Sequence, residues 1–469
     1  MEPLQNVLMV SQLSRSTPSA EGIHPPAILD FIAAANREFD GLHSMMLLRH
    51  GKVVAEGWWH PYSAERRHMM YSVSKSFTST AIGLAIDEAR LGLDSRVVDL
   101  LPDDLPAEVD DHLAALTVRN LLTMTTGHAT DTVALAELAP SGNWARAILE
   151  QPLVSPPGRL FTYNSGATYL LSAILQRLTG ERLLDYLTPR LFLPLGITDA
   201  TWESCPRGID AGGWGLSITT EDLAVFGQLL LQRGVWNGRR LVPAEWIDGA
   251  SAPQVDTSDA DHGIDGRQGY GYQFWRCRPA GSFRADGAFG QLCIVLPEQD
   301  AVIVFTSGIP EAQPLLDLVW HHLLPAFDDH PLEPVSFELP TLTTQTIGGV
   351  LPSRAVSAVF DSDAVGFINI DDGALTLARR GLLERIGYQS GEWMLAPDLP
   401  IAATGGWMSP DTFIARIARI ETPYLETIEL TVDGGAATLD IRQNVGFGSI
   451  PHLRVTGVVS SRPSSVKIP

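Results

Sequence analysis

The sequence predicts an α/β domain, in which an antiparallel β-sheet is flanked by helices and carries a helical insertion, followed by a C-terminal all-β barrel or sandwich. Three observations favour this fold. Apolar alternating strands occur near both ends of the first 327 residues, helical periodicity lies between them, and short alternating segments follow a proline-rich stretch. With 469 residues and 45% hydrophobic content, the chain can bury a large core. We expect domains at 1–327 and 346–469, joined by a linker at 328–345.

The first domain is expected to open with a helix over 26–40 and then a hairpin around His50-Gly51, with strands over 44–49 and 53–59. Short helical pieces over 91–135 form the predicted insertion. A helix over 168–178 ends at Gly180, and a capped helix follows Thr219. The remaining expected elements are a helix start at 243–247, strands at 269–275, 285–291, 293–296 and 301–307, and a helix at 312–327 that packs on the sheet.

The second domain is predicted from short alternating segments separated by turn signals such as Asp433-Gly434-Gly435. We expect a packing or dimerising appendage rather than a substrate lid, because no catalytic constellation is evident past residue 346. The expected strands lie at 365–370, 374–378, 412–420, 427–432 and 437–441.

Composition narrows the class of partner. The formal charge of −21 would repel nucleic acid and anionic membranes. Three cysteines (Cys205, Cys277 and Cys293) without metal-type spacing favour a reducing compartment and no disulfide framework. The sequence shows neither a signal peptide pattern nor a run of about 18 apolar residues. We therefore expect a cytoplasmic protein without metal or cofactor that acts on a small molecule, with homo-oligomerisation left open.

Ser72 and Lys75 form an S-x-x-K pair at the start of an apolar-periodic run that extends to Ala89, which places them on one face of a helix N-terminus. A serine hydroxyl is a poor nucleophile until a neighbour takes its proton, and lysine can do so only when its pKa is lowered. The helix start also offers the backbone N–H of Ser72 to an oxyanion. The pair therefore predicts a nucleophile and its base.

Lysine is scarce in this chain, which sharpens the interpretation. Only three of the 33 basic residues are lysines, namely Lys52, Lys75 and Lys467. Because arginine does not deprotonate in a protein, a general base is one role for which an arginine-rich chain still requires lysine. The alternative is that Ser72 is an ordinary N-cap and Lys75 a solvated first-turn residue.

Two further segments carry candidate site residues. Tyr163, in a turn-rich segment before a helix, would act as a proton relay if a cation such as Lys75 lowered the pKa of its hydroxyl; the alternative is a packing residue. The segment 285–291 places glycines inside a strand pattern. Such glycines indicate either close approach of a ligand or backbone, or a bulge.

Together, Tyr71 to Phe77, Thr162 to Gly166, Ala211 to Thr219 and Asp286 to Gln291 resemble, in order and approximate spacing, the serine β-lactamase and penicillin-binding-protein superfamily. The resemblance covers roughly residues 20–327 and is to the class C-like branch, with its family VIII esterases, D-amino-acid amidases and nylon-oligomer hydrolases. It implies that Ser72 is acylated, that Lys75 and Tyr163 move its proton, and that the N–H groups of Ser72 and Ala288 form the oxyanion hole. It further implies that Ser165, Gly287 and Gln291 lie beside the substrate.

Two departures from the family pattern bear on the substrate. The family's Tyr-x-Asn motif is here Tyr163-Asn164-Ser165, and the lysine or histidine that usually opens the strand motif is here Ala285. Without that cation, a β-lactam or peptide carboxylate has no anchor unless Arg278 or Arg284 replaces it. The sequence thus predicts a serine ester or amide hydrolase with weak or no β-lactamase activity. A non-catalytic ligand-binding or scaffold protein that keeps the fold is the alternative.

Overall fold

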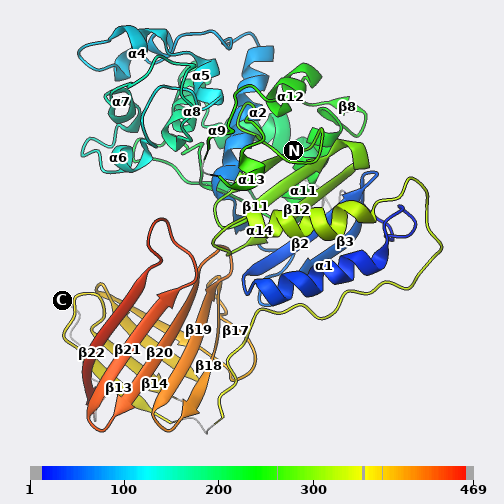
Figure 1. Ribbon diagram of the computed structural model, residues 1–469. Coiled ribbons are helices and arrows are strands. Elements are labelled where there is room, and N and C mark those ends of the chain that lie inside the picture. Colours follow the sequence, from blue (N-terminus) through cyan, green and yellow to red (C-terminus); the bar gives the residue numbers. More distant parts are fainter. Residues whose placement is uncertain (1–12, 261, 351–353, 372, 461–469) are drawn as a thin grey trace, which may run out of the picture.

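The structure is a computed structural model that describes residues 13–260, 262–350, 354–371 and 373–460 (Figure 1). A seven-stranded sheet lies at the centre of the first domain, in the order β1-β3-β2-β12-β11-β10-β9. Its neighbours pair antiparallel, except β1 and β3, which are parallel. The strands are β1 (Ser14–Arg15), β2 (Leu42–Arg49), β3 (Lys52–Trp58), β9 (Trp275–Arg276), β10 (Phe283–Gly287), β11 (Gln291–Leu296) and β12 (Ala301–Ser307). The predicted antiparallel sheet is therefore confirmed.

Helices cover both faces of this sheet, so that the central strands β2, β11 and β12 are buried on both sides. Helices α1 (Pro25–Glu38) and α14 (Gln313–Leu318) pack on one face, and α14 continues helically to Ala326. Helices α2 (Ser74–Asp87) and α11 (Thr220–Leu231) pack on the other face, where their phenylalanines Phe77 and Phe226 stack on each other (Figure 1). Thr219 caps α11 through a capping box, as the sequence predicts.

A helical lobe packs beside α2; it includes the predicted insertion at 91–135 and extends beyond it to Leu195 (Figure 1). Helix α8 is its longest member, and it ends at Gly180 in a left-handed conformation, as the sequence predicts. The lobe contains α3 (Val97–Leu100), α4 (Asp111–Ala115), α5 (Val118–Leu122), α6 (Val133–Glu137), α7 (Trp144–Leu149), α8 (Ser165–Thr179), α9 (Leu183–Leu187) and α10 (Leu193–Leu195).

Small elements connect the lobe to the sheet. Strand β6 (Leu216–Ile218) pairs with β4 (His68–Met69) and β5 (Thr201–Trp202). The other small elements are β7 (Val235–Trp236), β8 (Arg239–Arg240), α12 (Ala244–Ser251) and α13 (Gly263–Gly266). Among the described residues, no helix combines the length and apolar character that a bilayer-spanning segment requires.

The predicted strand at 269–275 is wrong in all but its last residue, because β9 covers only Trp275–Arg276. The preceding backbone folds against the end of α12 instead. A Cβ at Gly271 would lie 1.9 Å from the carbonyl oxygen of Ala250, so this glycine is required by close backbone contact and not by a strand.

The predicted linker runs along the first domain and is not a free spacer. Segment 328–345 contains no helix or strand beyond an isolated pairing of His60 with Thr343. The side chain of Leu342 reaches strand β3 at Gly57, where a Cβ would lie 2.5 Å from the Leu342 methyl group. Figure 1 shows this yellow-green segment passing around the first domain to the second.

The second domain is a single ten-stranded antiparallel sheet that curves into a nearly closed barrel, which confirms the predicted all-β domain (Figure 1). Its order is β16-β15-β14-β13-β22-β21-β20-β19-β18-β17. The strand of this domain that comes first in the sequence, β13, therefore pairs with the strand that comes last, β22. Arg379 on β15 donates hydrogen bonds to Glu426 on β20 at 2.7 and 2.9 Å, joining strands distant in the sheet. The strands are β13 (Val356–Phe360), β14 (Phe367–Asp371), β15 (Ala374–Arg379), β16 (Leu382–Gly387), β17 (Met394–Leu395), β18 (Ile401–Ser409), β19 (Thr412–Arg419), β20 (Leu425–Asp433), β21 (Ala436–Gln443) and β22 (His452–Ser460).

Candidate active site

Ser72 lies in a short 3-10 turn, Tyr71–Val73, that leads directly into α2. The turn is tied to β6, because the N–H of Met70 donates to the carbonyl of Leu216 at 2.8 Å and the N–H of Leu216 donates to the Ser74 hydroxyl at 3.1 Å. Tyr71 has a φ of +46°, which is uncommon for a residue with a side chain. The backbone that presents Ser72 is therefore held by its surroundings.

Lys75 is the second residue of α2 and is almost completely buried. Its Nζ donates to the Ser72 hydroxyl at 2.8 Å, to the Ser165 hydroxyl at 3.1 Å and to the carbonyl of Gly213 at 2.8 Å. Burial lowers the pKa of Lys75 to about 7, and the nearby Asp131 carboxylate opposes this shift. A lysine with such a pKa is substantially neutral near pH 7, so it can accept a proton from Ser72.

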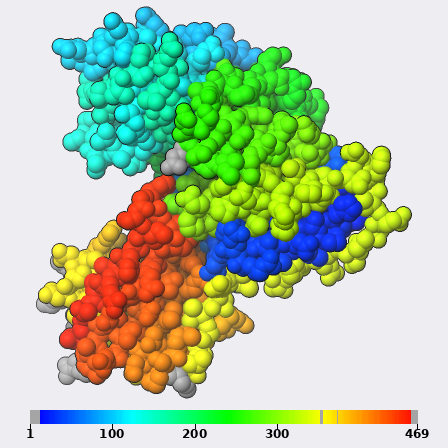
Figure 2. Space-filling view, in the orientation of Figure 1, coloured from blue at the N-terminus to red at the C-terminus, as the bar shows by residue number. Residues whose placement is uncertain are grey.

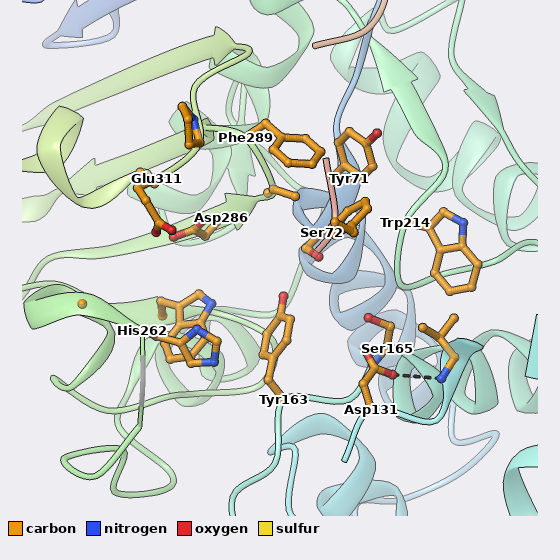
Figure 3. Close-up of a pocket in the computed structure, with 18 of the residues that line it drawn as sticks. Tyr71, Ser72, Asp131, Tyr163, Ser165, Trp214, His262, Asp286, Phe289 and Glu311 are labelled. Carbon is orange, nitrogen blue, oxygen red and sulfur yellow. Dashed lines mark hydrogen bonds between the residues drawn. The ribbon is translucent and has the colours of Figure 1, made fainter. Parts of the chain in front are cut away.

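Tyr163 stands on the other side of Ser72, and Figure 3 shows their hydroxyl groups facing one another. Its ring stacks on Trp275 with centroids 5.5 Å apart, and the Lys75 Nζ lies 4.8 Å from its centroid. Burial raises the pKa of Tyr163, although contact with Ser72 acts in the opposite direction. The expectation that Lys75 lowers this pKa is therefore wrong, and Tyr163 is suited to relay a proton as a neutral phenol.

Asn164 and Ser165 have different tasks at the start of α8. Asn164 is buried, and its side-chain oxygen accepts hydrogen bonds from the N–H of Gly166 at 2.9 Å and from the N–H and hydroxyl of Thr132 at 3.1 and 3.0 Å. Ser165 instead reaches Lys75, and its N–H donates to the Asp131 carboxylate at 3.0 Å. Ser165 thus contacts Lys75 directly and lines the same pocket as Ser72; its expected place beside the substrate stays a prediction.

The turn between β10 and β11 brings Gly287 and Ala288 to the pocket that contains Ser72. A Cβ at Gly287 would lie 2.3 Å from the carbonyl oxygen of Met70, so only glycine allows this strand to approach the Ser72 turn. Gln291 lies behind the turn, fully buried. Its side-chain amide donates to the carbonyls of Ala288 at 3.0 Å and Ser307 at 2.7 Å and accepts from the N–H of Ser307 at 3.1 Å. The expectation that Gln291 lies beside the substrate is corrected: it holds the turn.

Ala285 faces the buried core, while its neighbours Arg284 and Asp286 line the pocket. Alternation along β10 explains this, since successive side chains point to opposite faces. Arg284 is buried, and its Nε donates to the Asp286 carboxylate at 2.7 Å. Asp286 helps to keep the pKa of Arg284 raised, so Arg284 stays charged but is already paired. The other candidate cation, Arg278, pairs instead with Asp265 at 2.9 Å and with Asp317.

These residues surround a pocket of about 960 Å³ (Figure 3). Among its described lining residues, the ionisable carboxylates outnumber the single arginine, Arg284. The carboxylates belong to Asp131, Glu137, Asp286 and Glu311. Asp131, Glu137 and Glu311 were not predicted as site residues, because they come from loops and short helices without motif or periodicity.

The C-terminal domain also contributes to this pocket. Gly446, Phe447 and Gly448, from the β21–β22 loop, line it together with Ser72. In the same region the hydroxyl of Tyr71 is hydrogen-bonded to that of Tyr424, at 2.5 Å. The expectation that this domain is an appendage without site residues is therefore wrong. In Figure 2 its red tip reaches the cleft between the cyan lobe and the green part of the first domain.

The described residues contain no group of three or more histidine, cysteine, aspartate or glutamate side chains arranged to hold a metal ion. All three cysteines are buried and unpaired.

An antiparallel sheet flanked by helices, with an S-x-x-K helix under a helical lobe, defines the serine β-lactamase and penicillin-binding-protein class of fold. The Beta-lactamase family model matches residues 35–320, which is more than half of the chain, and the protein belongs to this family.

Known relatives agree with this assignment. The chain is 28% identical over 287 residues to a 6-aminohexanoate-dimer hydrolase of Paenarthrobacter ureafaciens, covering 57% of this chain and 73% of that protein. Among solved structures, EstCE1, a hydrolase with promiscuous acyltransferase activity, matches 63% of this chain and 99% of its own, with a TM-score of 0.54 and 18% identity. An octameric penicillin-binding protein homologue from Pyrococcus abyssi matches 92% of this chain and 98% of its own, with a TM-score of 0.51 and 16% identity.

Proposed function

We propose that this protein is a serine hydrolase that cleaves an ester or amide bond of a small molecule through an acyl-enzyme on Ser72. The observation that carries the proposal is the buried Lys75, whose Nζ lies 2.8 Å from the Ser72 hydroxyl and whose pKa is lowered to about 7. A lysine kept for packing or solubility has no need of this contact, whereas a general base requires both the proximity and the lowered pKa.

The reaction follows from these positions. The Ser72 Oγ attacks the carbonyl carbon and forms a C–O bond, while its proton passes to neutral Lys75. The N–H groups of Ser72 and Ala288 stabilise the negative oxygen of the tetrahedral intermediate. Its collapse breaks the bond to the alcohol or amine, which takes the proton from Lys75 by way of Tyr163. Water then attacks the acyl-enzyme and gives a proton to Lys75 by way of Tyr163. Collapse of the second tetrahedral intermediate breaks the bond to Ser72 Oγ, which takes the proton back from Lys75, and releases the acid.

The relatives support this reaction class, since the Paenarthrobacter protein and EstCE1 are both hydrolases. A cytoplasmic location and homo-oligomerisation stay predictions for this chain.

Covalent labelling tests the proposal directly. Incubation with a fluorophosphonate, followed by intact mass measurement and peptide mapping, should give a single adduct on Ser72. Ser72→Ala should abolish both the adduct and the hydrolysis of p-nitrophenyl acetate. A folded wild-type protein that neither labels nor turns over any member of an ester and amide panel would favour the non-catalytic alternative.

A further inference from the structure

The loop between β21 and β22 is fixed to the first domain at its base. The Asn444 side chain donates to the carbonyls of Gly308 and Pro423, both at 2.9 Å, and accepts from the N–H of Leu425 at 2.8 Å. Gly308 directly follows β12, and a Cβ there would lie 2.2 Å from the carbonyl oxygen of Pro423. The two domains are therefore in tight backbone contact where this loop begins.

Beyond this base, the loop presents one side chain to the core, that of Val445, and one to the pocket, that of Phe447. Val445 is 1% exposed and packs with Tyr71 and Phe289. Phe447, two residues later and between two glycines, is 70% exposed and lines the pocket. Since Val445 already supplies the packing contact, Phe447 is not needed to hold the domains together.

Phe447 is the solvent-exposed member of a group of three aromatic rings next to Ser72. Its ring centroid lies 5.0 Å from that of Phe289 and 5.6 Å from that of Tyr71, and the latter two are 5.3 Å apart. Tyr71 and Phe289 are each only 8% exposed, so their remaining contacts are filled. An exposed apolar surface of this kind, at the mouth of a pocket, favours an apolar ligand group.

We propose that Phe447 is a specificity-determining residue, whose ring forms with Phe289 and Tyr71 a subsite for an apolar alkyl or aryl group of the substrate. The inference rests on the proposed acylation of Ser72 and narrows its substrates to esters or amides that carry such a group. The occupant is apolar rather than anionic, because the pocket also presents the carboxylates of Asp131, Glu137 and Glu311.

The test compares wild type, Phe447→Ala and Phe447→Leu in the 469-residue chain with both domains present. The readout is kcat/KM for p-nitrophenyl acetate, butyrate and hexanoate, which vary the acyl group, and for methyl, butyl and benzyl acetates, which vary the leaving group. Leu382→Ala is the control, since Leu382 is 74% exposed on β16 of the same domain and does not line this pocket.

In at least one series, Phe447→Ala should lower the ratio of kcat/KM for the largest substrate to that for the smallest by tenfold or more. Phe447→Leu should lower this ratio less, and Leu382→Ala should leave it within twofold of wild type. An unchanged ratio in both series overturns the inference, as does a ratio that rises, which would make the ring a barrier and not a contact surface.

Fluorophosphonate labelling and thermal melting of each variant separate this inference from the proposed function. If the wild type is not labelled, the proposed function itself is contradicted. If the variants fold and are labelled but keep the wild-type ratio of kcat/KM between the largest and the smallest substrate, only the proposed role of Phe447 is contradicted.

Discussion

The lowered pKa of Lys75 depends on where its amine lies. Nζ is buried between Ser72, Ser165 and the carbonyl of Gly213, and the nearest opposing carboxylate, Asp131, is itself engaged by the N–H of Ser165. Burial therefore outweighs the carboxylate and brings the pKa of Lys75 to about 7. Tyr163 responds in the opposite direction, because burial penalises a phenolate. The two residues are thus both neutral near the pH at which Ser72 must lose its proton.

The pH dependence of acylation follows from this pKa. Neutral Lys75 predominates above pH 7, so kcat/KM for p-nitrophenyl acetate should be constant above about pH 8 and fall by about tenfold per unit as pH drops below 7. Lys75→Arg should abolish turnover, since arginine stays protonated. The matched control is Lys52→Arg, because the Lys52 side chain is 44% exposed and bonded to Glu21. An inflection near pH 10 would contradict a buried base.

The expected preference for a neutral over an anionic substrate depends on the pair Arg284–Asp286. The guanidinium is in the pocket wall, but its Nε is bound to Asp286 at 2.7 Å. A substrate carboxylate therefore gains no charge-assisted hydrogen bond, which would contribute roughly 1.5 to 3 kcal/mol, and it meets Asp131, Glu137 and Glu311 instead.

We expect a neutral methyl ester to be cleaved at least tenfold better in kcat/KM than the matched substrate with a free carboxylate, measured at low and moderate salt. Asp286→Asn should narrow this difference, because it frees Arg284. A preference of the wild type for the acid that persists at moderate salt would show that Arg284 binds anions in spite of its partner.

At the scale of elements, the site is assembled where the β10–β11 turn meets the 3-10 turn that carries Ser72. Gly287 allows the contact, and Gln291 holds the turn from behind by bonding Ala288 and Ser307. Gln291, which does not line the pocket, therefore helps to determine where the N–H of Ala288 lies.

Gln291→Leu tests this positioning role. It leaves the buried N–H and carbonyl of Ser307 and the partly buried carbonyl of Ala288 without their Gln291 partner, at a cost of about 1 to 3 kcal/mol in the free energy of unfolding. Because the turn loosens, kcat should fall by about tenfold or more while KM changes little.

Gln228→Leu is the matched control, since Gln228 is buried in α11 and its side-chain oxygen has no hydrogen-bond partner among the described residues. It should change neither the free energy of unfolding by more than about 1 kcal/mol nor kcat. A Gln291→Leu protein with normal kcat would exclude the positioning role.

At the scale of the molecule, the barrel is held firmly against the first domain. Arg416 on β19 pairs with Asp40, which follows α1, and donates to the carbonyl of Gln345 at 2.7 Å. The N–H of Gln345 in turn donates to Asp40 at 3.0 Å, so the linker joins the same cluster. This contact and the Asn444 contact fix the barrel so that Phe447 reaches the pocket.

Arg416→Met should weaken the coupling between the domains. Arg416 is buried whereas Asp40 is partly exposed, so we expect a loss of about 1 to 3 kcal/mol in the free energy of unfolding. Urea unfolding followed by tryptophan fluorescence should change from one transition towards two. Arg385→Met, which removes an exposed pair with Asp371 inside the barrel, is the control and should cost less than about 1 kcal/mol. Equal effects of the two changes would argue against a coupling role.

What the sequence determines by itself is local. The three-residue spacing of Ser72 and Lys75, the capping box at Thr219 and the left-handed end of α8 at Gly180 each depend on residues within one or two helical turns. The antiparallel sheet flanked by helices could also be expected, because the motifs resemble those of a known family. The first three features are visible in a pattern because short-range sterics and hydrogen bonding specify them.

The tertiary structure alone decides the rest. Phe447 meets Ser72 at the same pocket although 374 positions separate them in the chain, Ala285 turns to the core while Arg284 and Asp286 face the pocket, and Gln291 supports the turn instead of the substrate. The pKa of Lys75 is lowered only because distant segments exclude water from its amine. Desolvation and contacts between remote segments exist only once the chain has packed, so no local pattern encodes them.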